Sequence, residues 1–130
     1  MQETLFSRFK FRHNMYKLRE ERPMEPETFA NLVSTMLYEK RFGPYFCQPV
    51  IAGLSAAGAP YLCGMDSIGA METAKDFMVG GTAPESLIGV CESFWQPDMV
   101  RYALLARAWG LSVGCLLVVG APARCGGEAN

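Results

Sequence analysis

The stretch LYEKRFGPYFCQPVIAGL, residues 37–54, takes the chain from the end of a helix through a tight turn and into a strand. Before the turn, apolar residues recur at the three-and-four spacing of a helix with one buried face: Phe29, Leu32, Val33, Met36 and Leu37. Gly43 can leave the helical conformation easily, and because it precedes Pro44 it is also disfavoured in that conformation. After the turn, Val50 and Ile51 are β-branched, as is typical of a strand. The stretch therefore predicts a helical layer packed against a sheet.

Upstream of this stretch, the chain predicts two helices that pack antiparallel. Residues 1–19 contain no Pro or Gly and place apolar side chains at helical spacing. A charged turn at 20–24 follows, and Pro26 suits the first position of a second helix, which we expect to run to about residue 42. A connection this short between helices favours an antiparallel pair.

Downstream, the pattern changes to short strands. Residues 47–54 and 61–71 are expected to form a hairpin, and 76–80 a third strand of the same antiparallel sheet. The spacing of Thr82 and Glu85 is that of a capping box, so a third helix should begin there and end at Pro97.

The bulk composition points to an intracellular protein with covered apolar surface. The chain has 130 residues and a net charge of −1, which provides no global attraction to nucleic acid or to an anionic membrane. Its five cysteines include no C-x-x-C pair, which predicts reduced thiols. Half of the residues are apolar and eight are Met, so we expect a partner to cover part of the surface. Basic and aromatic residues alternate in the first helix, but the acidic remainder of the chain argues against nucleic-acid binding.

The end of the chain allows two interpretations. Residues 100–109 could form a helix and 111–119 a strand, and the glycine-rich residues 120–130 are expected to be disordered. Alternatively, the apolar run 102–119 with its small residues at Gly110 and Gly114 could be a membrane anchor. An arginine inside the run would cost about 2.5 to 3.5 kcal/mol near the bilayer centre, which favours a buried tail.

Residues 37–45 and 49–54 closely resemble the proteasome beta subunits, specifically their type-3 branch, which have the N-terminal-nucleophile hydrolase fold. The similarity runs from about Thr4 to Met99 and includes Lys10-Phe11-Arg12, Cys63 with Asp66, Asp76-Phe77, Gly81-Thr82, and Cys91-Glu92-Ser93 with Trp95 and Pro97. It implies an α+β fold, a partial αββα sandwich without its N-terminal strands and with an atypical C-terminus. The expected regions are a beta-type domain fragment at 1–99, an atypical apolar segment at 100–119 and the tail at 120–130.

The resemblance also implies a function. Beta type-3 subunits are non-catalytic structural members of the proteasome core particle, the chamber of ubiquitin-dependent protein degradation in cytoplasm and nucleus. The expected partners are other alpha-type and beta-type subunits. Catalytic relatives use an N-terminal threonine, whereas residue 1 is Met, and Gly80 stands where they carry a supporting serine. The resemblance implies that the chain is a truncated or alternatively spliced form of such a subunit. The alternative is a membrane-associated or non-functional isoform, driven by the apolar C-terminal segment.

We therefore expect no catalytic, cofactor-binding or metal-binding residue in this chain. His13 has no neighbouring ligand at a spacing that suits a metal, and the thiols have no base nearby in the sequence. The candidate residues are instead those suited to contact neighbouring subunits: Arg12, Tyr16, Tyr38, Arg41, Phe42, Tyr45 and Trp95.

Overall fold

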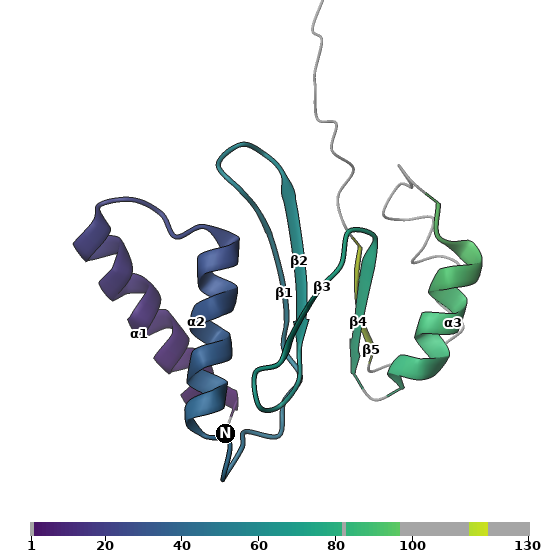
Figure 1. Ribbon diagram of the computed structural model, residues 1–130, viewed down its shortest axis with the longest axis horizontal. Coiled ribbons are helices and arrows are strands. Elements are labelled where there is room, and N and C mark those ends of the chain that lie inside the picture. Colours follow the sequence, from purple (N-terminus) through teal and green to yellow (C-terminus); the bar gives the residue numbers. More distant parts are fainter. Residues whose placement is uncertain (1, 82, 97–114, 120–130) are drawn as a thin grey trace, which may run out of the picture.

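A computed structural model describes residues 2–81, 83–96 and 115–119. Its elements are α1 (Gln2–Glu20), α2 (Pro26–Glu39), β1 (Val50–Leu54), β2 (Pro60–Met65), β3 (Met71–Thr73), β4 (Phe77–Gly81), α3 (Pro84–Phe94) and β5 (Cys115–Val119). Figure 1 shows them in layers: α1 and α2, then the sheet β1-β2-β3, then the pair β4-β5, then α3. This order confirms the predicted α+β fold and partial αββα sandwich.

The first two helices lie on the outer side of the first sheet and run in opposite directions, as predicted (Figure 1). The rings of Phe9 and Phe29 join them, meeting edge-on at 6.4 Å between centroids. The prediction that α2 reaches residue 42 is wrong, because the helix ends at Glu39. The amides of Lys40 and Arg41 bond to carbonyls three residues back, at Leu37 and Tyr38, so the helix tightens into turns before the Gly-Pro pair.

β1 is shorter than the predicted strand at 47–54. Regular pairing begins at Val50, opposite Gly64, and continues to Leu54, opposite Pro60. Pro49 has no N–H to donate to a ladder, although its carbonyl accepts a bond from the Met65 amide at 3.0 Å. The proline therefore marks the start of the strand.

The predicted single strand at 61–71 is wrong, because the chain reverses between Met65 and Met71. The Asp66 carboxylate accepts bonds from the backbone amides of Ile68, at 3.0 Å, and Ala70, at 2.8 Å. Gly69 has a φ of +89°, a conformation that favours glycine. β2 therefore pairs antiparallel with the short strand β3, which the sequence did not predict.

β4 begins and ends within one residue of the predicted strand at 76–80, but it belongs to a different sheet. It pairs antiparallel with β5, Phe77 opposite Val119 and Gly81 opposite Cys115. The two sheets approach closely where glycines lie between them: a Cβ at Gly64 would meet the Met78 sulfur at 2.7 Å, and one at Gly80 would meet Val50 Cγ2 at 3.0 Å. The expectation of one three-stranded sheet containing residues 76–80 is thus corrected to two stacked sheets.

α3 covers the second sheet on its far side (Figure 1). Its N-cap is Ala83, which makes no side-chain cap bond, and Pro84 takes the first helical position. The helix therefore begins at Pro84, and the predicted capping box, which depends on Thr82, stays a prediction. The helix ends at Phe94, ahead of Pro97. Thr82, the predicted helix at 100–109 and the predicted tail at 120–130 lie outside the described residues.

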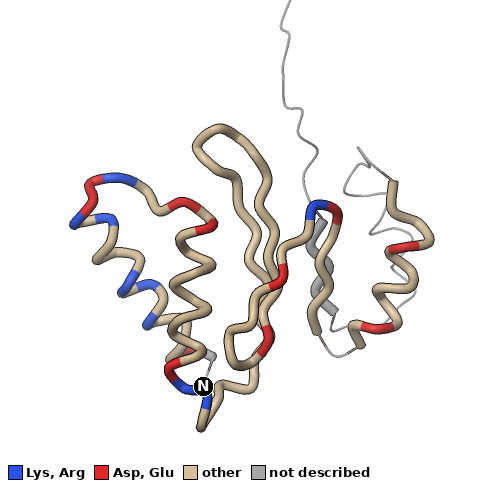
Figure 2. The backbone as a smooth tube through the Cα atoms, in the orientation of Figure 1, with Lys and Arg blue, Asp and Glu red and all other residues tan. Residues whose placement is uncertain are grey.

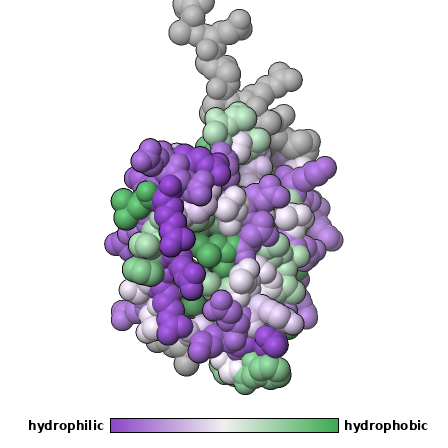
Figure 3. Space-filling model, turned by 60° about the vertical axis from the view of Figure 1, so that its left-hand side comes forward, coloured by the Kyte–Doolittle hydropathy of each residue, from purple (hydrophilic) through white to green (hydrophobic). Residues whose placement is uncertain are grey.

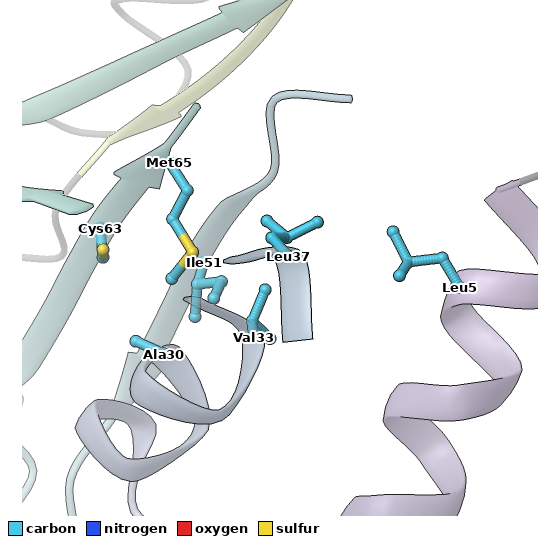
Figure 4. Packing of buried hydrophobic residues seen from close by; sticks show 7 residues of the cluster. All are labelled: Leu5, Ala30, Val33, Leu37, Ile51, Cys63 and Met65. Carbon is cyan, nitrogen blue, oxygen red and sulfur yellow. The ribbon is translucent and has the colours of Figure 1, made fainter. Parts of the chain in front are cut away.

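The core lies between the helical layer and the first sheet (Figure 4). It contains Leu5 from α1, Ala30, Val33 and Leu37 from α2, Ile51 from β1, and Cys63 and Met65 from β2. On the other side of the molecule, Leu87 and Cys91 are the buried residues of α3. The predicted buried face of α2 is confirmed at Val33 and Leu37, whereas Ala30 was not among the residues expected there.

Candidate subunit interface

Three of the predicted interface residues form a cluster at the end of α2. The guanidinium carbon of Arg41 lies 4.6 Å from the ring centroids of both Tyr38 and Phe42. Its Nη1 also donates to the Tyr38 carbonyl at 3.4 Å. The tight turn after Glu39 brings these residues together, and it leaves 55% of Tyr38 and 91% of Phe42 exposed. Tyrosine and arginine are among the residue types that contribute most to protein interfaces.

Two other predicted residues, Arg12 and Tyr16, lie on α1. Both line a hollow of about 430 Å³ that reaches across to Leu32 of α2. The guanidinium carbon of Arg22 lies 5.7 Å from the Tyr16 ring centroid. Figure 2 shows basic residues following one another along α1, and Figure 3 shows apolar surface between hydrophilic bands on the side where α1 and α2 come forward. This face combines apolar and cationic groups, which suits a partner with apolar and acidic ones.

The last two candidates lie elsewhere. Tyr45 is half-buried against the core, and its hydroxyl accepts a bond from Arg8 Nη1 at 3.0 Å. Trp95 is the C-cap of α3, half-buried in the opposite outer layer. The structure thus gathers Tyr38, Arg41 and Phe42 in one cluster and leaves Tyr45 and Trp95 apart from it. Whether the seven residues contact neighbouring subunits stays a prediction.

The side chains of three cysteines, Cys47, Cys63 and Cys91, are at least half-buried. Cys63 and Cys91 are buried and Cys47 is half-buried. Loss of solvation raises the pKa of all three thiols above the ordinary value. A raised pKa keeps a thiol protonated at neutral pH, and the protonated form is a poor nucleophile.

These thiols lead to a prediction about pH. Folded-state thiols hold their protons more tightly than those of the unfolded chain, so their contribution to stability is complete below the unfolded pKa. We expect the free energy of unfolding, measured by urea titration, to fall as pH rises above about 8.5.

Alkylation of Cys63 and Cys91 by iodoacetamide, followed by peptide mass spectrometry, should be at least about tenfold slower in the folded chain than in urea. Equal alkylation rates in the folded chain and in urea would contradict the burial of Cys63 and Cys91.

Within residues 2–81, 83–96 and 115–119, no group of three or more His, Cys, Asp or Glu side chains could hold a metal ion. None of the helices described here is both long enough and apolar enough to cross a membrane. The described end of the apolar run, Cys115–Val119, is the strand β5 and not part of a helix.

Comparison with known proteins decides the family. A sequence model described as "Proteasome subunit" matches residues 2–106. The chain belongs to the proteasome subunit family. It is similar to a "Proteasome subunit beta type-3" from Picea mariana, with 69% identity over 97 residues that cover 75% of this chain and 48% of the relative. It also resembles "Proteasome subunit beta type-3-A" from Arabidopsis thaliana, at 66% over the same shares, and the type-3 subunit of Saccharomyces cerevisiae, at 54% over 74% of this chain and 47% of the relative.

The chain therefore spans about half the length of the curated relatives that it matches. All three of these relatives, from Picea mariana, Arabidopsis thaliana and Saccharomyces cerevisiae, are beta type-3 subunits. The resemblance stated from residues 37–54 is confirmed.

The structure also shows two features that the sequence analysis did not predict, the exposure of Phe46 and the burial of one nitrogen of His13. Phe46, two residues after Pro44, is 87% exposed. The Nδ1 atom of His13 is buried without a hydrogen-bond partner among the described residues. The exposure of Phe46 could have been predicted from its place beside the Gly-Pro turn. The burial of the His13 nitrogen could not, because it depends on the packing of α1 against α2 and β1.

Proposed function

We propose that the chain acts as a non-catalytic structural subunit of the proteasome core particle, placed in the beta ring among other alpha-type and beta-type subunits. The observation that carries this proposal is the exposed cluster of Tyr38, Arg41 and Phe42 in a chain 69% identical to a beta type-3 subunit. Stacked guanidinium and aromatic groups left in solvent are suited to bury against a partner. The proposed setting is cytoplasm and nucleus, where the particle degrades ubiquitin-marked proteins.

Several of the described hydroxyl and thiol groups support the non-catalytic part of the proposal. The hydroxyls of Ser34, Thr35 and Ser93 all donate to main-chain carbonyls, so their protons serve local structure. Cys63 and Cys91 are buried thiols with raised pKa values. A side chain at Gly80, the position matched to a supporting serine in catalytic relatives, would press on Val50.

The test is an epitope-tagged chain expressed in cells and separated on a glycerol gradient. We expect the tag to sediment with assembled cores or with a smaller assembly intermediate that contains other beta subunits. The double change Arg41→Ala with Phe42→Ala should lower the co-sedimenting fraction at least about tenfold, because a loss of only about 1.4 kcal/mol of binding free energy already weakens binding tenfold. The matched control is Lys75→Ala, which removes an exposed cation from the turn between β3 and β4.

Two results would contradict the proposal. One is a wild-type tag found only near the top of the gradient, in a pellet or with membranes, which would indicate a non-functional or membrane-associated form. The other is a double variant that sediments like Lys75→Ala, which would exclude this cluster from the contact.

A further inference from the structure

The solvent-facing side of α1 carries a row of apolar side chains. Phe11, Met15 and Leu18 follow one another at spacings of four and three residues, so their side chains lie in one stripe along the helix. They are 62%, 38% and 75% exposed. Leu5 and Phe9 lie on the other side of the helix and pack in or against the core. α1 is therefore apolar on two faces, and one of them is in contact with solvent.

Basic residues flank this stripe on both sides. Arg12 and Arg19 line the hollow between α1 and α2, whereas Lys10 lines a groove of about 640 Å³ between α1 and β1. Arg8 precedes Arg12 by about one helical turn and Lys17 follows Lys10 by about two, so each lies on the same side as that residue. All five side chains are exposed.

The charge on this side of α1 is unbalanced. Between Glu3 and Glu20 the sequence has five Lys and Arg and no Asp or Glu. Within the part of the chain that the structure describes, no salt bridge reaches any of these five cations. Figure 2 shows the basic residues following α1 along its length. The electrostatic potential outside α1 is therefore positive, although the whole chain has a net charge of −1.

We propose that this face of α1 binds the surface of a membrane that contains anionic lipid. The apolar stripe enters the boundary between the headgroups and the acyl chains, and the flanking Lys and Arg contact anionic headgroups. Amphipathic helices with cations beside an apolar face bind in the plane of a membrane in this way. The helix lies on the membrane and does not cross it.

An acidic protein is the weaker candidate. A protein groove that takes up an amphipathic helix needs space for a wall on each side of that helix. α2 lies alongside α1 and contacts it through the rings of Phe9 and Phe29, so one of these spaces is already filled. A flat lipid surface needs no such space, and it can contact the stripe and both of its basic borders at once.

The test is sedimentation of the purified full chain with sucrose-loaded vesicles. One set consists of phosphatidylcholine alone, and the other contains about one quarter phosphatidylglycerol, an anionic lipid. We expect the partition coefficient of the chain to be at least about tenfold higher for the anionic vesicles in about 0.1 M salt. It should fall at least about threefold in about 0.5 M salt, because salt screens the attraction between the cations and the headgroups.

A pair of substitutions tests the apolar stripe. Phe11→Ala with Leu18→Ala should lower the partition coefficient for the anionic vesicles at least about tenfold, because it removes the two most exposed side chains of the stripe. Phe46→Ala is the matched control, since this ring is 87% exposed but lies outside α1. The control should bind like the wild-type chain.

A second pair tests the basic border. Arg12→Gln with Arg19→Gln should lower the same partition coefficient at least about fivefold. Lys40→Gln with Lys75→Gln removes two exposed cations outside α1 and should leave it nearly unchanged. The two double variants have the same net charge, so a difference between them depends on where the cations lie.

Amine labelling of the unmodified chain gives a readout that does not depend on any variant. Anionic vesicles should slow the modification of Lys10 and Lys17 at least about threefold, because these amines lie against the headgroups. Modification of Lys75 should be nearly unchanged. Neither lipid carries a primary amine, so peptide mass spectrometry reports the protein alone.

Several results would overturn the proposal. One is equal partition into the two kinds of vesicle, and another is protection of Lys75 to the same extent as Lys10. Failure to bind vesicles, together with binding to polyglutamate, would overturn it and indicate an acidic protein as the partner. The proposal goes beyond the proposed function and concerns the free chain, so failure of vesicle binding and failure of the gradient test are independent results.

Discussion

Replacing Leu37 with alanine is expected to lower the free energy of unfolding by about 3 to 5 kcal/mol. Leu37 is completely buried and lies at the centre of the cluster that joins α1, α2 and the first sheet (Figure 4). Its truncation removes apolar burial and leaves a cavity that rigid neighbours on three elements fill only partly. Since domains of this size are stable by only about 5 to 15 kcal/mol, the variant should lose much of its folded population. Urea unfolding followed by circular dichroism measures the change.

The control for this prediction is Leu18→Ala. Leu18 has the same side chain but is 75% exposed on α1, so its loss should change the free energy of unfolding by no more than about 0.5 kcal/mol. Similar effects of the two substitutions would mean that the helical layer does not pack on the sheet as described.

The helical layer could be predicted because its signals are local. The three-and-four spacing that ends at Leu37 and the position of Pro26 determine where α2 begins and which face it buries. The end of α2 was harder to predict, because the residues from Lys40 to Gly43 suit either a continued helix or a series of tight turns. Only the bonding pattern distinguishes them.

The sheets could be predicted less completely because strand partners are not local. Apolar residues run from Tyr61 to Met71 with little interruption, and the turn inside that run depends on one carboxylate, Asp66, and one glycine, Gly69. Pairing of β4 with β5 joins segments that lie more than thirty residues apart, and no spacing rule identifies such a partner.

For the candidate interface, sequence could predict which residue types suit a contact but not where they lie. Tyr38, Arg41 and Phe42 are close in sequence, and the turn after α2 brings them into one cluster. Tyr45 is only three residues further on, yet it packs on the core.

Gly69→Ala is the second substitution with a large expected effect, about 2 to 4 kcal/mol of lost stability. Gly69 has a φ of +89°, which side-chain-bearing residues rarely adopt, and a Cβ there would collide with the Ser34 carbonyl oxygen on α2. The obstacle is backbone inside a helix and cannot rotate away. The turn between β2 and β3 would have to move off α2, and thermal unfolding should show a lower midpoint.

Two further substitutions separate the causes of this effect. Ser34 Oγ donates to the Gly69 carbonyl at 2.6 Å, so Ser34→Ala removes the bond but introduces no collision and should cost about 1 kcal/mol. Gly43→Ala adds a methyl group with nothing within 4 Å and should be nearly neutral. A Gly69→Ala effect no larger than that of Ser34→Ala would show that the turn tolerates a side chain. The contact between this turn and Ser34 of α2 would then contribute little to the packing of the first sheet against the helical layer.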